Sequence, residues 1–413
     1  MTKYEKKTGI IYDILQKRAI LSFFNNDKTI ITGGPGTGKT TIVEGIIALL
    51  REAFPYYQIA ICAPTGRAAK RLKELVEVDV STIHSLLEWN LETNTFGRNH
   101  ANPLYADILV VDEFSMVDSY TMAALCDATP FVRKIVFIGD KDQLPSVGPG
   151  FLIRDLIMSQ QFVVTTLEHN YRQDSGSNII SLAKSVNNGV FDLSLCKQDV
   201  SFFDSDEQLR QLVMTLYIKA MDSGYRVDDI QVLAPKYEGT HGIDALNFML
   251  QKALNPNNPK KRELKFGYMT FREGDKLLQL KNQPDDFVFN GDTGILIEII
   301  YKDESDDRKD HLIVDFDGVI VEYNPDTFIH LKHAYCMSVH KAQGSEYPVV
   351  IFVGSRQHRF MMQKRLLYTG LTRAKNALIC IGDVNVFMEA CQKEYSDEIM
   401  TKLVERIQRL SDM

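Results

Sequence analysis

A glycine-rich segment contains the residue types that most directly indicate chemistry. Its residues fit the pattern GxxxxGK[ST] and are Gly33, Gly34, Pro35, Gly36, Thr37, Gly38, Lys39 and Thr40. Glycines permit a tight turn whose backbone N–H groups face the phosphates of a nucleotide. Lys39 is expected to reach the β- and γ-phosphates, and Thr40 to hold Mg²⁺. The segment therefore predicts a site that binds ATP with Mg²⁺. We include the next residue, Thr41, in this site.

Polar residues also follow two other apolar runs. Asp112 and Glu113 come directly after Ile108–Val111, and Gln143 lies in the loop after Lys134–Ile138. In open α/β sheets, ligands bind outside the carboxyl ends of the strands. We expect Asp112 to complete the Mg²⁺ shell, Glu113 to polarise the attacking water, and Gln143 to contact the γ-phosphate or that water. The pattern indicates phosphoryl transfer to water.

The spacing of apolar residues indicates the fold that positions these groups. In roughly the first 150 residues, short apolar runs alternate with amphipathic runs, which favours a parallel sheet covered by helices. The alternation returns from about Val163 to Leu264 and again after Ala334. Between Gly267 and Lys332, short strands joined by turns indicate a small β-barrel. We therefore predict an α/β protein with a β insert.

Composition limits the classes of protein to which this chain can belong. The chain has 413 residues, of which 45% are hydrophobic and 24% charged, as expected of a folded globular protein. No apolar run is long enough to predict a membrane span. The six cysteines are scattered without a CxxC pair, which favours a reduced, cytoplasmic setting. The net charge of -7 leans against a nucleic-acid partner, unless a groove is locally basic.

The order of motifs along the chain resembles that of superfamily 1 helicases of the RecD-like, 5′→3′ branch, including the Dda-type phage helicases. The matching stretches are Gln16, GGPGTGKT, APTGRAAKRL (63–72), STIHSLL (81–87), VVDEFSMVD (110–118), GDKDQLPSVGPG (139–150), LEHNYRQ (167–173), VLAPKYEGTHGIDALN (232–247), SVHKAQGSEYP (338–348) and RLLYTGLTRAK (365–375). The resemblance covers almost the whole chain. Longer members carry a sizeable N-terminal region, whereas 15 residues precede Gln16 here, so we carry over no activity housed in that region.

The resemblance implies two RecA-like P-loop NTPase cores, with a hairpin insert in the first and an SH3-like β-barrel insert in the second. The first core is expected at 1–155, with the hairpin at about 88–105. The second core is expected at 156–266 and 333–413, with the SH3-like insert at 267–332. The family places one ATP site between the cores, and hydrolysis there opens and closes a cleft around a single strand.

Further roles at the nucleotide follow from the resemblance residue by residue. Gln16 would read the adenine edge, and Glu346 would approach the nucleotide sugar. Arg172 and Arg373 would reach the γ-phosphate from the second core. Arginines suit this role because negative charge spreads over the γ-phosphoryl oxygens in the transition state.

The resemblance also implies contacts with single-stranded DNA. In the first core the candidates are Pro64, Thr65, Arg67, Thr82 and His84, and in the second they are Lys236, His340 and Lys341. Hydroxyl and basic groups suit phosphate contacts, which carry no sequence information. A threonine before a helix is equally suited to capping that helix.

The hairpin at about 88–105 lies where relatives carry a pin that splits the duplex. We expect its turn at Asn94–Gly97, which makes Phe96 the candidate wedge and DNA contact, while Trp89 anchors the hairpin to the core. Stacking a base on an aromatic ring returns roughly 1–3 kcal/mol, which offsets much of the cost of opening a base pair.

The sequence therefore predicts an ATP-dependent DNA helicase that moves 5′→3′ on single strands and acts on forked DNA. It is expected to be a monomer without a membrane anchor, in the cytoplasm, at the nucleoid or at a viral replication site, with unknown protein partners. The alternatives are a translocase that displaces proteins without unwinding, an RNA-directed helicase, and a module that binds ATP as a switch.

Overall fold

The computed structural model describes residues 2–76, 78–90, 92–171, 176–283, 286–394 and 401–411. Its contacts divide the chain into two compact units. The first comprises Met1–Gly176 together with Ser396–Met413, and the second comprises Ser177–Tyr395. Within the described ranges, no helix is both long and apolar enough to pass through a bilayer.

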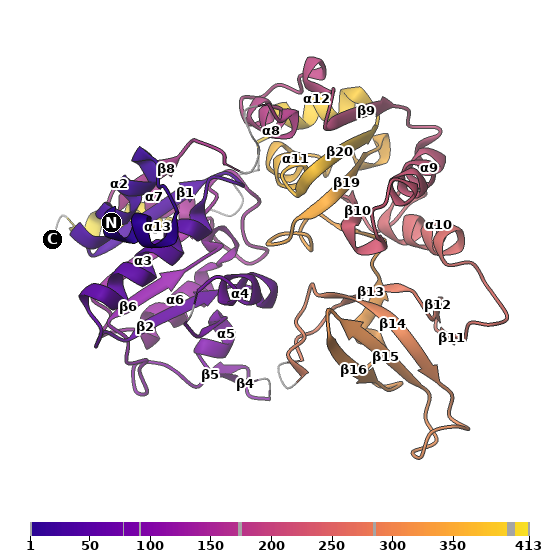
Figure 1. Cartoon of the computed structure of the whole chain (residues 1–413), viewed down its shortest axis with the longest axis horizontal. Coiled ribbons are helices and arrows are strands. Elements are labelled where there is room, and N and C mark those ends of the chain that lie inside the picture. The colour runs from indigo at the N-terminus through magenta and orange to yellow at the C-terminus, as the bar shows by residue number, and fades with distance from the viewer. Residues whose placement is uncertain are drawn as a thin grey trace. The chain divides into compact units, whose positions relative to one another are not determined.

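The first unit is built on a parallel sheet with the strand order β3-β2-β6-β7-β1-β8 (Figure 1). Its strands are β1 (Lys28–Gly33), β2 (Ile59–Ala63), β3 (Val80–Thr82), β6 (Ile108–Val111), β7 (Lys134–Gly139) and β8 (Val163–Leu167). Successive strand residues point to opposite faces, so Ile30 and Ile31 enter two different buried clusters. Because both faces of its central part are buried, β2, β6 and β7 read as nearly continuous apolar runs.

Helices cover both faces of this sheet. The helices of the unit are α1 (Thr2–Thr8), α2 (Ile14–Asn25), α3 (Lys39–Ala53), α4 (Gly66–Lys73), α5 (Ile83–Leu86), α6 (Ser119–Ala128), α7 (Leu152–Met158) and α13 (Leu403–Ser411). Apolar residues of α2, α3 and α4 form one cluster with the sheet. Those of α5, α6 and α7 form the other, and Leu403 and Ile407 of α13 pack against it.

The predicted division of the chain differs from these contacts in two places. Residues 156–176 were assigned to the second core, but β8 pairs with β1 in the first sheet. This strand alternates between exposed and buried positions, as an edge strand does, so its apolar pattern did not identify its sheet. Residues 401–411 were also assigned to the second core, but Thr401 Oγ1 donates to Asp155 Oδ2 at 3.1 Å in the first unit.

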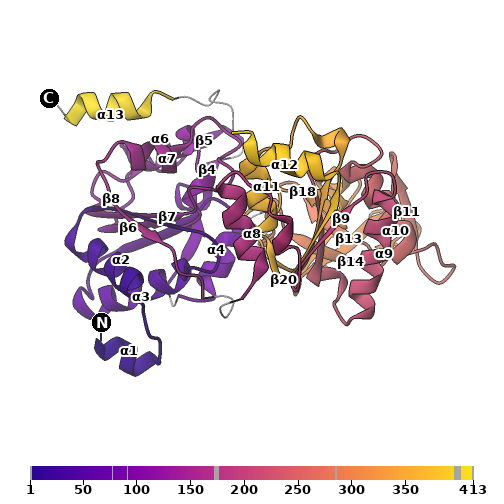
Figure 2. The same cartoon turned by 90° about the horizontal axis from the view of Figure 1, so that it is seen from above.

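The second unit contains another parallel sheet, with the order β18-β10-β19-β20-β9. Its strands are β9 (Val200–Asp204), β10 (Ile230–Ala234), β18 (Cys336–Ser338), β19 (Tyr347–Gly354) and β20 (Ala374–Gly382). The accompanying helices are α8 (Asn178–Asn187), α9 (Leu209–Asp222), α10 (Ile243–Leu254), α11 (Lys364–Leu371) and α12 (Val384–Gln392), which Figure 2 shows from above.

The β insert of the second unit lies between β10 and β18 in sequence. It has a hairpin, β11 (Glu263–Phe266) with β12 (Met269–Arg272), and an antiparallel sheet with the order β16-β15-β14-β13-β17. The strands of that sheet are β13 (Lys276–Gln279), β14 (Thr293–Ile300), β15 (His311–Phe316), β16 (Val319–Tyr323) and β17 (Leu331–His333). These strands enclose their own apolar cluster, as the predicted small β domain requires.

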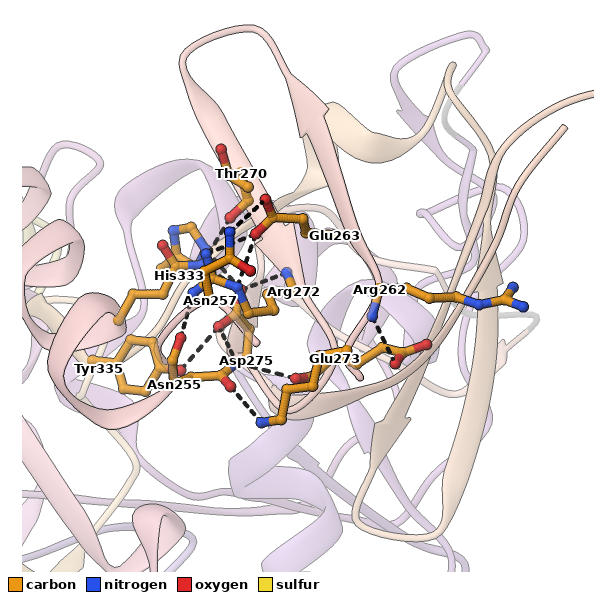
Figure 3. A network of polar contacts seen from close by, with 12 residues as sticks. Asn255, Asn257, Arg262, Glu263, Thr270, Arg272, Glu273, Asp275, His333 and Tyr335 are labelled. Atoms are coloured by element: carbon orange, nitrogen blue, oxygen red, sulfur yellow. Dashed lines mark hydrogen bonds and ion pairs between the residues drawn. The ribbon is translucent and has the colours of Figure 1, made fainter. Parts of the chain in front are cut away.

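A buried carboxylate joins this insert to the sheet and to α10 (Figure 3). Asp275 is fully buried, and its oxygens accept from Gln251 Nε2 at 2.6 Å, Asn255 Nδ2 at 2.8 Å and the Arg272 N–H at 2.8 Å. The Tyr335 hydroxyl donates to it at 3.1 Å, and His333 Nε2 lies 3.2 Å away. A buried charge is tolerated when donors surround it in this way.

We predict that Asp275→Asn destabilises the second unit by about 2–4 kcal/mol, since an amide nitrogen would replace one of the carboxylate oxygens that now accept from Gln251, Asn255 and the Arg272 N–H. Chemical denaturation combined with hydrogen exchange of the β13 and β17 amides measures the effect. Asp303→Asn, at an exposed position in the loop between β14 and β15, is the matched control. Unchanged protection of β13 and β17 in Asp275→Asn would contradict the role assigned to the carboxylate.

Candidate functional site

The glycine-rich segment forms a closed turn between β1 and α3. Gly36 and Gly38 have φ of 73° and 79°, in the left-handed region that glycine adopts without strain. Lys39 Nζ donates to the carbonyl oxygens of Gly33 at 2.7 Å and Gly34 at 2.9 Å, and Thr37 Oγ1 donates to Gly34 O at 2.8 Å. The loop is thus curved around its own lysine, at the N-terminus of α3, where anions are favoured.

Gln16 lies directly beside this loop, as the predicted adenine contact requires. Its side chain is 5% exposed, and Nε2 donates to Thr37 O at 3.4 Å. A reciprocal capping box with Asp13 at the start of α2 fixes its orientation. A Cβ at position 38 would lie 2.3 Å from Gln16 Nε2, so a larger residue there would displace the Gln16 amide from the loop.

Asn170 and Tyr171 brace the same loop from the segment after β8, a role that sequence reasoning missed. Asn170 Nδ2 donates to Pro35 O at 2.5 Å, and the Tyr171 N–H donates to Gly36 O at 2.8 Å. The Tyr171 hydroxyl donates to Asp13. The sequence did contain a signal for this role, because both residues directly precede Arg172, which was predicted to reach the γ-phosphate. Arg172 itself lies outside the described residues.

The acidic pair lies at the end of β6, where it was expected. The Glu113 N–H donates to Asp112 Oδ1 at 2.9 Å. Burial and the neighbouring Glu113 raise the pKa of Asp112 to about 6, while Lys39 and Arg71 act in the opposite direction. A divalent cation bound by Asp112 would lower that pKa, because the cation stabilises the carboxylate.

Glu113 and Gln143 occupy constrained positions next to Asp112. Glu113 has a φ of 49° and a ψ of 38°, an uncommon conformation for a residue with a side chain. Gln143 follows β7, is 3% exposed and donates from Nε2 to Asp140 Oδ2 at 3.3 Å. Strands β6, β7 and β1 are consecutive in the sheet, so their carboxyl ends bring Asp112, Gln143 and the glycine-rich loop to one edge.

The predicted strand contacts of the first unit lie farther along that edge. Strands β2 and β3 pair with Ala63 opposite Thr82, so Pro64, Thr65 and Arg67 lie beside Thr82 and His84. The two threonines cap helices: Thr65 Oγ1 accepts from the Ala68 N–H at 3.3 Å and Thr82 Oγ1 from the Ser85 N–H at 3.0 Å. A threonine hydroxyl that accepts in this way can still donate its own hydrogen.

The prediction that Phe96 forms the tip of the hairpin is wrong. Strands β4 (Trp89–Asn90) and β5 (Thr95–Phe96) pair Trp89 with Phe96, so Phe96 lies in the second strand and the turn does not fall at 94–97. The Phe96 ring is 4.6 Å from that of Trp89 and 5.6 Å from that of His84, and it packs against the core. Burial of an aromatic ring outweighed the turn signal of Asn94–Gly97.

In the second unit the predicted residues fall at opposite ends of the sheet. Lys236 follows β10, and His340 and Lys341 follow β18, which is its neighbour. Burial lowers the pKa of both His340 and Lys341. The Lys341 ammonium donates to Asn290 of the β insert.

Glu346 and Arg373 lie at the amino end of this sheet, since they immediately precede β19 and β20. Arg373 is 2% exposed, and its guanidinium donates to Thr369 O at 3.0 Å, Ser345 O at 3.1 Å and Thr372 Oγ1 at 3.2 Å. The Tyr347 N–H donates to Arg373 O at 2.8 Å, which joins the starts of the two strands. These three bonds use three of the five guanidinium N–H groups and fix the orientation of the side chain.

Comparison with known families and proteins shows which of them this chain is similar to. Residues 16–149 match the AAA domain family, residues 246–316 the ATP-dependent RecD-like DNA helicase SH3 domain, and residues 333–381 the UvrD-like helicase C-terminal domain. The ATP-dependent RecD2 DNA helicase of Deinococcus radiodurans is 33% identical over 379 residues, covering 92% of this chain. The chain is therefore similar to RecD-like helicases along most of its length.

The chain spans 50% of the length of that Deinococcus protein. The RecBCD enzyme subunit RecD of Mycolicibacterium smegmatis is 29% identical to it over 408 residues, which cover 89% of this chain and 70% of the relative.

Solved structures confirm the predicted fold of this chain. The Pif1 helicase of Candida albicans aligns with a TM-score of 0.58 at 17% identity, covering 97% of this chain and 100% of the other. The Bacteroides Pif1 helicase, in complex with ADP-AlF3 and single-stranded DNA, aligns with a TM-score of 0.60 at 16% identity and 98% coverage of both chains. The fold class, RecA-like parallel sheets with an SH3-like insert, is therefore as predicted.

We predict that Lys39→Ala abolishes ATP hydrolysis, because no other group of the loop supplies a positive charge to the phosphates. Phosphate release in the presence of single-stranded DNA measures this. Lys28→Ala, at the exposed start of β1, should retain turnover. ATP-driven unwinding by Lys39→Ala would overturn the assignment of this loop.

We predict that Asn170→Asp raises the KM for ATP by about tenfold or more, because a carboxylate would face the Pro35 carbonyl and repel the phosphates. Steady-state ATP hydrolysis measures it, with Asn188→Asp, an exposed residue after α8, as the control. Equal KM values for the two variants would show that the brace does not position the loop.

Proposed function

We propose that this chain is an ATP-dependent DNA helicase that moves along single-stranded DNA. One observation carries the proposal: the carboxyl edge of a single sheet holds the predicted nucleotide residues after β1, β6 and β7 and the predicted strand residues after β3 and β2. These five strands are consecutive in one sheet, so the nucleotide residues and the strand residues share a common support.

The hydrolytic step follows from the chemistry of these groups. Lys39 neutralises charge on the β- and γ-phosphates, and Thr40 and Asp112 would hold Mg²⁺. The cation would supply positive charge that offsets the negative charge of the phosphates. The donor set fits, since a hydroxyl and a carboxylate are the oxygen ligands that Mg²⁺ prefers. Glu113 accepts a proton from the attacking water as the bond to the β-phosphate oxygen breaks, and Gln143 orients that water.

Arginine completes the site in this proposal. Arg373 of the second unit and Arg172 place positive charge on the γ-phosphoryl oxygens, while Glu346 approaches the sugar. An arginine in this role contributes about 10³–10⁵ in rate. Because Arg373 belongs to the second unit, hydrolysis depends on the approach of the two units.

Movement along DNA follows from coupling that approach to two sets of strand contacts. Pro64, Thr65, Arg67, Thr82 and His84 hold the strand in the first unit, and Lys236, His340 and Lys341 hold it in the second. Alternating release of the two grips gives a step in one direction, which the family resemblance makes 5′→3′. The Pif1 relatives, which include complexes with single-stranded DNA and a study of unwinding at forked DNA, support DNA as the partner.

The assembly and the cellular setting complete the proposal. We place the protein in the cytoplasm, at the nucleoid or at a site of viral replication, and we expect it to act as a monomer. The RecD relatives are described as subunits of the RecBCD enzyme, so partner proteins are a second element to test.

A forked duplex with either a 5′ or a 3′ single-stranded tail tests this function directly. We expect ATP-dependent strand separation on the 5′-tailed fork and little on the 3′-tailed fork. Turnover stimulated by single strands without strand separation would favour a protein-displacing translocase. Stimulation by RNA instead of DNA would favour an RNA helicase, and undetectable turnover with either polymer would favour a nucleotide switch.

A further inference from the structure

A cavity of about 110 Å³ lies in the second unit where α10, β12, β13, β17 and β18 meet. It is smaller than the roughly 300–1,000 Å³ clefts that hold drug-sized ligands, so one small flat group fits it best. Its lining includes side chains from the RecA-like sheet, from α10 and from the β insert. No residue of the nucleotide site described above takes part in it.

Exposed aromatic side chains surround this cavity. Tyr237, Phe248 and Tyr268 line it and are 36%, 57% and 78% exposed. Lysines lie over two of the rings: Lys332 Nζ is 5.1 Å from the Tyr237 centroid, and Lys252 Nζ is 4.2 Å from that of Phe248. Grouped exposed aromatic rings mark a binding surface, and the combination with lysines is the one that single-stranded nucleic acids use.

The inner wall of the cavity is held rigidly. Gln251 Nε2 donates to Thr270 O at 2.8 Å and to Asp275 at 2.6 Å, and His333 Nε2 lies 3.1 Å from the Gln251 amide nitrogen. Figure 3 shows His333 and Thr270 in the polar network that includes Asp275. The cavity is therefore preformed by the network that anchors the insert, and binding does not require it to be rebuilt.

The polar groups of the wall are already engaged with the protein. Asn247 uses both ends of its amide on β18, donating to Cys336 O at 2.9 Å and accepting from the Cys336 N–H at 2.8 Å. Gln251 is committed to Asp275 and Thr270. The groups left for a ligand are chiefly rings and aliphatic surface, which suit stacking more than hydrogen-bond recognition of a particular base.

We propose that this cavity receives a nucleobase of the single strand that passes Lys236. Tyr237 directly follows Lys236, and Lys332 adds positive charge at the same edge. The carboxylate of Asp244 also lines the cavity, so a phosphate would be repelled from it whereas an uncharged base would not. The base stacks on Tyr237 and Tyr268 with little preference for sequence. This inference rests on the proposed function.

Binding of a labelled single-stranded oligothymidylate, followed by fluorescence anisotropy at fixed salt, is the first test. Tyr237→Ala and Tyr268→Ala should each weaken binding by about 5- to 10-fold, because each removes a stacking surface. Tyr237→Phe should bind as the parent does. Tyr56→Ala, which removes a 91% exposed tyrosine of the first unit that is not part of the cavity, is the matched control. DNA-independent ATP turnover and circular dichroism check that each variant is folded.

The decisive test moves a single abasic nucleotide along the oligonucleotide. The parent protein should lose affinity when the abasic site occupies one particular position, and Tyr237→Ala should show no additional loss there. Identical position profiles for the parent and for Tyr237→Ala would overturn the base-binding proposal, even if single strands still stimulate ATP turnover. Failure of the parent protein to bind single strands would instead overturn the proposed function, so the two outcomes are distinguishable.

Discussion

Parallel pairing of strands is the constraint on which the rest of this molecule depends. When neighbouring strands run parallel and in register, the residues that follow them lie at the same edge of the sheet, even where those residues are far apart in sequence. Gly33, Ala63 and Val111 end three such strands, so groups far apart in the chain become neighbours in space. The strands contribute mostly apolar side chains. Most of the candidate chemistry therefore lies at the ends of the strands, in the loops and first helical turns that follow them, and the sheet supplies their positions.

The buried carboxylate of Asp275 plays a similar organising role in the second unit. A small antiparallel β domain attached to an α/β sheet can tilt unless something fixes the junction. Donors from α10, from the end of β12 and from the residue before β18 converge on this one group, and apolar packing alone lacks that directionality. Burying a charge costs stability. The network therefore specifies one arrangement of the insert and the sheet more than it strengthens their association.

The sequence predicted the local parts of the site well and the long-range parts poorly. The glycine-rich loop, Asp112 and the short strands of the insert are encoded by residue types within a few positions, and they lie in the predicted elements. The brace formed by Asn170 was missed because it acts through a backbone carbonyl 135 positions away. The register of the hairpin depends on whether Phe96 packs against the core. Turn propensity carries no information about that packing. The edge strand β8 and helix α13 are placed by tertiary contacts that no local periodicity reveals.

The first unit is assembled from two stretches of the chain that the second unit separates in sequence. Leu403 and Ile407 of α13 complete an apolar face whose other residues lie between Ile30 and Val164. During synthesis that face therefore leaves the ribosome incompletely covered, and α13 reaches it only after the second unit has been made. Any shortened gene product that stops after the second sheet would leave the same face bare, with the aggregation hazard that exposed apolar surface brings.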